Sequence, residues 1–458
     1  MELMQNINDY VERERDGLVS GLIEFLRLKS ISAQNIGMQE CAQALSMTMQ
    51  SLGIKTEMWQ IEGGYPALFG EITNSKAQKT LLIYGHYDVQ PPEPLELWES
   101  DPFEPVIREG KLYARGATDD KGNLWATLMA VKCLKEIGVE LPINLKFFFE
   151  GEEEIGSPSI EGYLSQHKDA LKADYTILCD RGIHESGRPQ MYLGNKGNMA
   201  VELKIKGAKR DVHSGQAPLI PNSAWQLTWL LNQLKNSQEE ILIPGYYDDV
   251  LEPDEEDLKL LEGIPFDIEE YCETYGIKEI LPKGEKINVL SKLLFQPTAT
   301  INGLKSGYQG EGNKTIIPSE ASVKLDFRLV KNQDPSKSAK AIKEFLKEKG
   351  PENLDIHIGN PRNPSKVSGQ ADIVQVAAKA AHDVYEKEPV IWPLLDGSGP
   401  MSMFEEILDA PAIIIGLGAP FSYANTHAPN ENIGVQDYLY GVKLMAAIYY
   451  RYGRKDEN

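Results

Sequence analysis

Acidic and histidine side chains follow five apolar, strand-like segments of this sequence. In chain order these segments lead into His86, Asp119-Asp120, Glu153-Glu154, Asp180 and, after a loop, His427. Because sites in open α/β sheets form at the carboxyl ends of strands, we expect these side chains to meet. His, Asp and Glu without a thiolate are typical ligands of a hard or borderline metal ion. Five such ligands plus a bridging group exceed what one tetrahedral zinc ion uses, so the pattern favours two ions about 3.5–4 Å apart.

Each of these residues also has an ordinary structural explanation when it is taken alone. The alternatives are a core histidine for His86, a helix N-cap for Asp119-Asp120, a solvated pair for Glu153-Glu154, a turn cap for Asp180 and an exposed loop for His427. The coincidence of all five at strand ends favours the metal site over these separate explanations.

The segment FFFEGEEEIGS, residues 147–157, places four carboxylates at the exit of a core strand. They belong to Glu150, Glu152, Glu153 and Glu154. Four adjacent carboxylates repel one another and resist burial. Either a positive group lies beside them or the segment is a solvated loop, and periodicity alone leaves both possibilities open.

The elements that must position these residues follow an α/β pattern. TLLIYG (80–85), INLKFFFE (143–150) and YTILCD (175–180) are short apolar runs, and NLWATLMAVKCLKEIG (123–138) has one apolar helical face. Strands that alternate with helices predict an α/β fold in which helices flank a mostly parallel central sheet.

Near residue 199 the pattern changes to period-two alternation, as in MAVELKIKG and ASVKLDFRLV (321–330). This alternation is typical of a sheet with one solvated face. The α/β pattern returns after residue 372. We therefore predict a catalytic domain in two parts, 1–198 and 373–458, interrupted by a smaller α+β lid domain, 199–372. The acidic stretch EPDEEDLKLLEG (252–263) is predicted to be solvated surface.

The composition of the 458 residues limits the possible partners and compartments. The net charge of −21 argues against a nucleic-acid partner, since phosphate binding needs a basic surface. No apolar run is long enough for a membrane helix, and no signal peptide is recognisable. The four cysteines form no C-x-x-C pair, which fits a reducing cytoplasm.

Six motifs carry a family resemblance that runs from about residue 15 to about residue 450. They are YGHYDVQPP, LYARGATDDKG, EGEEEIGS, DVHSGQ, KTIIPSEASVKLDFRLV and NTHAPNENI, in this order. In these motifs the chain resembles the aminoacylase, carboxypeptidase and carnosinase family of di-zinc metallopeptidases, and its cytosolic dipeptidase branch in particular. The resemblance implies a zinc-exopeptidase-like catalytic domain interrupted by a lid and dimerisation domain.

The resemblance also implies a ligand set for two divalent ions per subunit, with zinc expected and manganese or cobalt as alternatives. His86 and Asp180 would bind one ion, Glu154 and His427 the other, and Asp119 would bridge them. Asp88 would orient His86 through its second ring nitrogen. The family has a cis peptide bond between the paired aspartates.

For catalysis, the resemblance implies that Glu153 is the general base. It would take a proton from a metal-bridging water and return it to the leaving amine. Glu150 and Glu152 match no family role, and we leave them as solvated or structural. His213 would stabilise the oxyanion from the partner subunit, which implies a homodimer joined through the lid; a turn histidine is the alternative.

Three further residues would hold the substrate. Arg328 would pair with its free carboxylate, because a guanidinium binds two carboxylate oxygens at once. Thr315 and Ser398 would hold its backbone. A surface salt bridge for Arg328 and ordinary turns for Thr315 and Ser398 are the alternatives.

These inferences predict a cytosolic metallopeptidase that hydrolyses dipeptides or short peptides with a free C-terminal carboxylate. An N-acyl amino acid deacylase on the same site, acting on acetyl, succinyl or carbamoyl substrates, is the second hypothesis. A metal-free binding protein is the third, and it is disfavoured because every matched position is filled. The segment between residues 216 and 281 matches the family poorly, so the substrate itself stays open.

Overall fold

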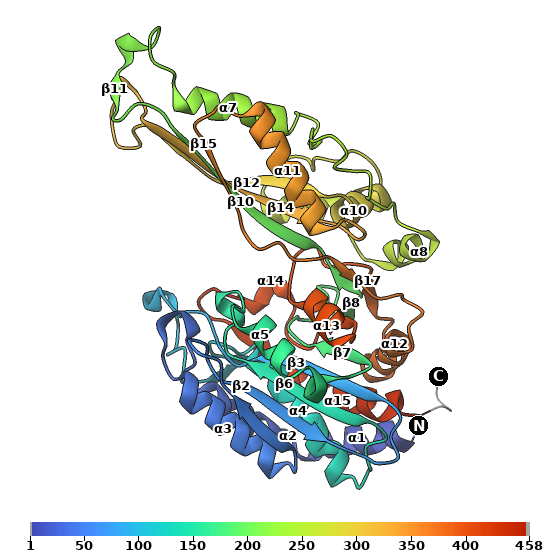
Figure 1. The fold of residues 1–458 in the computed structure, drawn as a ribbon. Coiled ribbons are helices and arrows are strands. Elements are labelled where there is room, and N and C mark those ends of the chain that lie inside the picture. The colour runs from blue at the N-terminus through green and yellow to red at the C-terminus, as the bar shows by residue number, and fades with distance from the viewer. Residues whose placement is uncertain (1, 455–458) are drawn as a thin grey trace.

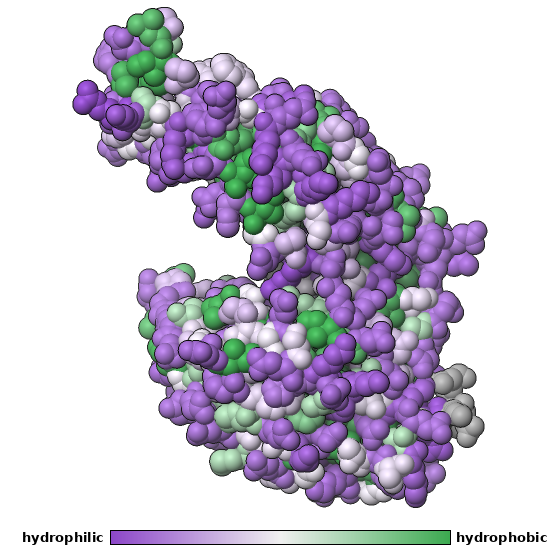
Figure 2. All heavy atoms as spheres, viewed as in Figure 1, coloured by the Kyte–Doolittle hydropathy of each residue, from purple (hydrophilic) through white to green (hydrophobic). Residues whose placement is uncertain are grey.

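The structure is a computed structural model that describes residues 2–454. Figure 1 shows two parts: an α/β part built on an eight-stranded sheet, and an elongated inserted part built on a four-stranded sheet. We call the inserted part, which runs from β10 (Gly197–Lys206) to β15 (Leu354–Ile358), the lid. The two parts meet at one end and leave an open cleft at the other, which is visible in Figure 2.

The eight-stranded sheet forms the centre of the α/β part. Its strands run in the order β1 (Lys55–Trp59), β2 (Ala67–Ile72), β6 (Asn144–Glu150), β3 (Thr80–His86), β7 (Tyr175–Leu178), β18 (Ala412–Ile415), β8 (Gln190–Tyr192) and β17 (Val390–Trp392). The four strands from β6 to β18 are mutually parallel. Parallel strands place their carboxyl ends at one edge of the sheet.

Alternating side chains pack the two faces of this sheet against helices. Phe147 and Phe149 of β6 belong to one buried cluster and Phe148 to another, which explains three consecutive phenylalanines in a strand covered on both faces. The helices of the α/β part are α1 (Glu2–Arg13), α2 (Arg15–Leu26), α3 (Met38–Ser51), α4 (Lys121–Glu136), α5 (Ile160–Gln166), α6 (Lys168–Leu171), α12 (Asp372–Tyr385), α13 (Met401–Leu408), α14 (Phe421–Ala424) and α15 (Val435–Tyr452).

Short elements connect these layers. They are the strands β4 (Val106–Arg108), β5 (Lys111–Tyr113), β9 (Gly194–Asn195), β16 (Ser365–Lys366) and β19 (Asn432–Gly434), and the 3₁₀ turns η1 (Ser32–Gln34), η2 (Leu95–Leu97) and η3 (Glu153–Ile155).

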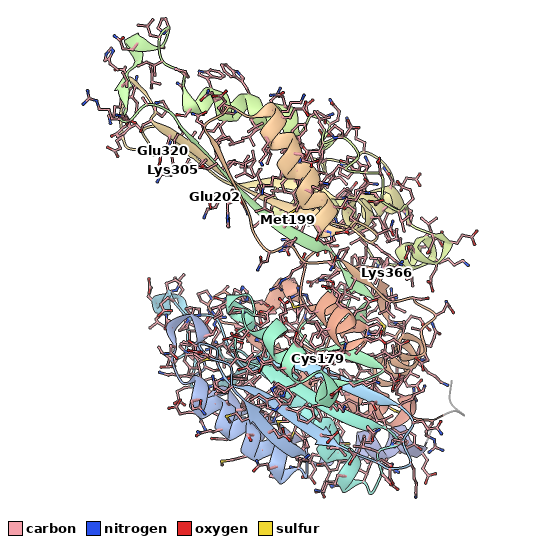
Figure 3. All side chains as sticks on the ribbon, in the orientation of Figure 1. Cys179, Met199, Glu202, Lys305, Glu320 and Lys366 are labelled. Atoms are coloured by element: carbon pink, nitrogen blue, oxygen red, sulfur yellow. The ribbon has the colours of Figure 1, made fainter. Side chains whose placement is uncertain are left out.

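The lid is an antiparallel sheet covered by helices on one face. Its strands run in the order β12 (Thr298–Ser306), β14 (Glu320–Leu329), β10 (Gly197–Lys206) and β15 (Leu354–Ile358). Alternate residues of β10 are buried, so Met199 packs in the core while Glu202 lies on the open face (Figure 3). The remaining lid elements are β11 (Val212–His213), η4 (Ser214–Gln216), α7 (Ser223–Leu234), α8 (Glu255–Gly263), α9 (Ile268–Tyr275), α10 (Lys286–Phe295), β13 (Ile316–Ile317) and α11 (Pro335–Lys349).

Most of the acidic stretch 252–263 lies at the surface, as its composition predicts, but Asp257 and Leu261 are buried. The stretch forms α8, whose Leu261 packs in a buried cluster with Val390 and Leu394 of the α/β part. Asp257 forms an ion pair with Lys366, and both side chains are only 4% exposed. Figure 3 places Lys366 where the two parts meet. Asp257 departs from the prediction because a lysine 109 residues away in the chain neutralises the buried aspartate.

The predicted fold class is confirmed: a mostly parallel sheet flanked by helices is interrupted by a smaller α+β unit. The predicted boundaries after residues 198 and 372 remain part of our proposal. None of the helices in residues 2–454 combines the length and apolar character needed to cross a bilayer.

Candidate metal centre

Three neighbouring parallel strands deliver most of the predicted site. β3 ends at His86, β6 leads into η3 with Glu153 and Glu154, and β7 leads to Asp180. Asp119 does not follow a strand of this sheet; it lies in the loop immediately before α4. Its peptide bond to Asp120 is cis, as the family resemblance implies.

The first group of candidate ligands is His86, Asp119 and Asp180. Nε2 of the fully buried His86 lies 3.2 Å from Oδ1 of Asp119 and 3.9 Å from Oδ2 of Asp180. The other ring nitrogen, Nδ1, lies 3.3 Å from Oδ1 of Asp88. Asp88 therefore orients the ring so that Nε2 points at the two carboxylates, the arrangement that the resemblance implies.

The second group is Asp119, Glu154 and His427. Nε2 of His427 lies 2.9 Å from Oδ2 of Asp119 and 3.2 Å from Oε2 of Glu154. Within each group the candidate ligand atoms lie within 4.8 Å of one another. Because Asp119 offers one oxygen to each group, the two groups share it as a bridge.

Several features of this cluster fit divalent cations. Nε2 of His86 and Oε1 of Glu154 are buried and lack a hydrogen-bond partner in the described residues. Hydrogen bonds to Asp119 and Glu154 raise the pKa of His427 to about 10. Burial, together with the charge of Asp119, raises the pKa of Asp180 to about 6. The pKa values of His427 and Asp180 are raised in part because several carboxylates lie close together. A bound cation would neutralise part of this negative charge.

Glu153 lies beside both groups without belonging to either. Burial raises its pKa to about 7, with the charges of Asp180 and Asp119 adding to the effect against that of His86. The oxygens of Asp88 accept hydrogen bonds from the backbone N–H groups of Glu153 (3.2 Å) and Glu154 (3.1 Å). Asp88 thus fixes both the His86 ring and the glutamate turn, and the sequence predicted only the first of these contacts.

Glu150 and Glu152 are buried rather than solvated, so of the two predicted options the structural one holds. Glu150 accepts hydrogen bonds from the Tyr84 hydroxyl (2.6 Å) and the Ser157 hydroxyl (2.9 Å). Glu152 accepts from the backbone N–H groups of Tyr65 (2.8 Å) and Ser159 (3.0 Å). These two carboxylates brace the turn that carries Glu153 and Glu154.

Two further residues that the sequence reasoning missed support the ligands. The fully buried Glu431 accepts hydrogen bonds from Arg115 (2.7 Å) and from the backbone N–H groups of Gly116, Thr118 and Asp119. Gln90 donates to Oε2 of Glu154 (2.8 Å). Glu431 lies four residues after His427, and this proximity was the only available signal for its role.

Two of the predicted substrate-binding residues lie in contact where the lid joins the α/β part. Nη1 of Arg328, at the end of β14, donates to Oγ of Ser398 at 2.8 Å. Nε of Arg328 donates to Oδ2 of Asp326 at 2.7 Å. The guanidinium is therefore held in place from two sides.

His213 and Thr315 are not brought to the metal ligands of their own chain. Both lie at the tip of the lid, where β11 pairs with β13 and the Ser214 N–H donates to the Thr315 carbonyl at 3.0 Å. Figure 1 shows β11 at the far end of the lid, across the cleft from the large sheet. His213 is exposed, and its Nδ1 accepts a hydrogen bond from the Gly215 N–H.

Comparisons with known proteins agree with this geometry. The profile of the peptidase family M20/M25/M40 matches residues 82–451. The human protein Beta-Ala-His dipeptidase is 30% identical over 473 residues, which cover 98% of this chain and 92% of the human protein. Cys-Gly metallodipeptidase dug1 of Schizosaccharomyces pombe is 28% identical and covers 96% of each chain. The crystal structure of the M20 family metallo-carboxypeptidase Sso-CP2 from Sulfolobus solfataricus superimposes with a TM-score of 0.88 at 39% identity, over 95% of this chain and 99% of that one.

Proposed function

Because the chain belongs to the peptidase family M20/M25/M40, we propose that it is a metal-dependent dipeptidase that cleaves the amide bond of substrates with a free C-terminal carboxylate. The observation that carries this proposal is the pair of ligand groups that share Asp119, with Glu153 beside them. Relatives named as dipeptidases, matched over nearly their whole length, support the substrate class.

The ligand set supports two divalent ions, and we propose zinc, with manganese or cobalt as alternatives. His86 and Asp180 would hold one ion, Glu154 and His427 the other, and Asp119 would contact both. When bound, such ions polarise the scissile carbonyl and lower the pKa of the attacking water.

In this proposal Glu153 moves the protons of the reaction. Its carboxylate would accept a proton from the attacking water and then donate it to the leaving amine. Burial of the Glu153 carboxyl raises its pKa above the usual value, which helps it to hold the proton until the leaving amine receives it. Asp88 contributes by fixing the backbone of the turn that carries Glu153.

Arg328 would hold the substrate's terminal carboxylate, and Ser398 would hold the substrate backbone beside it. The Arg328 guanidinium is already oriented by Asp326 and Ser398, so less side-chain entropy is lost when the substrate binds.

The proposal includes a homodimer in which His213 and Thr315 act in the partner's site. Both residues lie together at the lid tip, away from the ligands of their own chain. The lid also presents unpaired surface: β12 is an edge strand with Leu304 64% exposed, and Trp225 and Trp229 of α7 are 57% and 60% exposed. Exposed aromatic side chains and a free strand edge are features of a protein interface.

We also propose a cytoplasmic location. All four cysteines are free thiols, three of them buried, as is usual in a reducing compartment.

Two other substrate classes fit the same metal site. The deacylase hypothesis has no support from the dipeptidase relatives. Cleavage of longer peptides from the carboxyl end is favoured by the 39% identity to a protein described as a metallo-carboxypeptidase. The three classes differ in what they require at the substrate's amino end.

The deciding experiment compares free dipeptides, the same dipeptides with N-acetyl groups, and tripeptides, with the products identified by mass spectrometry. We expect metal-dependent cleavage of the free dipeptides and little of the acetylated set. Release of the C-terminal residue from acetylated dipeptides and tripeptides would reassign the protein as a carboxypeptidase, and release of acetate would reassign it as a deacylase.

A substitution tests the role of Glu153 in the same assay. Glu153→Gln keeps the side chain's shape but cannot accept the proton, so kcat should fall by about 10²–10⁴-fold while the metal content stays unchanged. An active Glu153→Gln enzyme would exclude Glu153 as the base.

A further inference from the structure

Arg181 directly follows the candidate ligand Asp180, and nothing in the proposed function uses it. Its backbone is firmly held. The N–H donates to the Cys179 carbonyl at 2.9 Å, and its carbonyl accepts from the N–H groups of Leu417 (2.8 Å) and Gly418 (3.1 Å). Cys179, labelled in Figure 3, lies in the α/β part just after β7. Arg181 is thus fixed at the same edge of the sheet as the ligands.

The Arg181 side chain is exposed to solvent. Within residues 2–454, its guanidinium makes no hydrogen bond and no ion pair closer than 4 Å. Packing against protein atoms lowers the pKa of this guanidinium, while the charges of Asp180, Tyr192 and Asp119 raise it. Arg181 thus carries a positive charge on the residue next to the candidate ligand Asp180, and its hydrogen-bond donors remain available.

Two other cations of this region are already engaged. Arg328 is paired with Asp326 and hydrogen-bonded to Ser398. Lys196 is buried and donates to the Gln296 carbonyl at 2.8 Å. Arg181 differs from both because its five N–H donors have no protein partner in the described residues.

A free guanidinium at a substrate site suits a carboxylate, which it can bind through two parallel hydrogen bonds. The terminal carboxylate is assigned to Arg328 in the proposed function, so Arg181 is available for a second one. The net charge of −21 repels acidic molecules. An acidic substrate therefore needs a positively charged side chain at the site to bind.

We propose that Arg181 binds a side-chain carboxylate of the substrate, so that the enzyme prefers dipeptides that contain an aspartate or a glutamate. This inference rests on the proposed function and specifies the substrate class of that same site.

The test uses pairs of dipeptides that match in shape and differ in charge: Ala-Glu against Ala-Gln, and Glu-Ala against Gln-Ala. For the metal-loaded wild type, kcat/KM of the acidic member should exceed that of the amide member by about tenfold or more in at least one pair. In Arg181→Met this ratio should fall to about one, while kcat/KM for the amide members stays within about threefold of wild type. Arg181→Lys should retain part of the preference.

Arg13→Met is the matched control, since it removes one exposed positive charge from α1, away from the site. It should leave all four values unchanged. The inference is overturned if the wild type shows no preference in either pair. It is also overturned if Arg181→Met lowers acidic and amide substrates equally or reduces the metal content, because Arg181 would then only balance the charge of the site. If the wild type hydrolyses none of the four dipeptides, the proposed function itself fails.

Discussion

The Glu150 carboxyl lies in surroundings that favour its neutral form. It is fully buried, and burial together with the charge of Asp88 raises its pKa from 4.5 to about 8, although the Tyr84 and Ser157 hydrogen bonds act in the opposite direction. The native state therefore binds a proton that the unfolded chain releases above pH about 4.5. The contribution of this group to stability is complete below that pH and is lost as the pH rises towards 8.

Replacing Glu150 with Gln removes this titration and keeps the shape of the side chain. Relative to wild type, Glu150→Gln should gain about 1.4 kcal/mol of unfolding free energy per pH unit between about pH 5.5 and 7.5. The measurement is urea unfolding of the metal-free proteins at several pH values, which leaves no bound cation to shift the titration. Parallel curves for the two proteins would show that Glu150 is ionised in the folded state.

At the residue scale, the sequence predicted the side chains that meet but not those that hold them. His86, Asp119 and Asp180 were predictable because each follows a recognisable apolar segment. The contacts of Glu431 with residues 115–119 join segments more than 300 positions apart, and no local pattern reports such a pairing. A residue that acts by accepting backbone hydrogen bonds leaves little signal in a single sequence.

At the element scale, α8 fastens the lid to the α/β part through one buried ion pair. Asp257→Ala would leave the Lys366 ammonium buried without its partner, which should cost about 3–5 kcal/mol of unfolding free energy. The double replacement Asp257→Leu with Lys366→Met should recover most of this loss, because it removes both charges together. Urea unfolding of the three proteins measures both effects. An unchanged stability for Asp257→Ala would mean that the pair is open to water in solution.

The same helix shows why composition predicted the exposed residues of the stretch 252–263 but not the burial of Asp257. Five of the first six residues of this stretch are acidic, which ordinarily indicates a solvated segment. The strands and helices with strong periodicity, such as β6 and α4, were predicted correctly because their apolar spacing is local. Burial of Asp257 depends instead on Lys366, which reaches it only in the folded chain.

At the scale of the whole molecule, the open cleft separates the lid tip from the metal ligands (Figures 1 and 2). If His213 takes part in catalysis, it must do so either in a partner's site or after a large movement of the lid. The buried contacts of α8 with Val390 and Leu394 oppose such a movement, because a lid that moved as a rigid body would break them. The partner's site is therefore the expected location for His213.

Mixing two inactive variants distinguishes these possibilities. Glu153→Gln retains His213, and His213→Ala retains Glu153, so a mixed dimer has one complete site only if each His213 serves the partner's site. Random pairing at equal amounts makes about half of the dimers mixed, with one of two sites active, so co-expression should restore about a quarter of wild-type activity. The separate variants, assayed alone, are the controls. If His213 serves its own chain, no dimer combines both residues in one site and the mixture stays as inactive as its components.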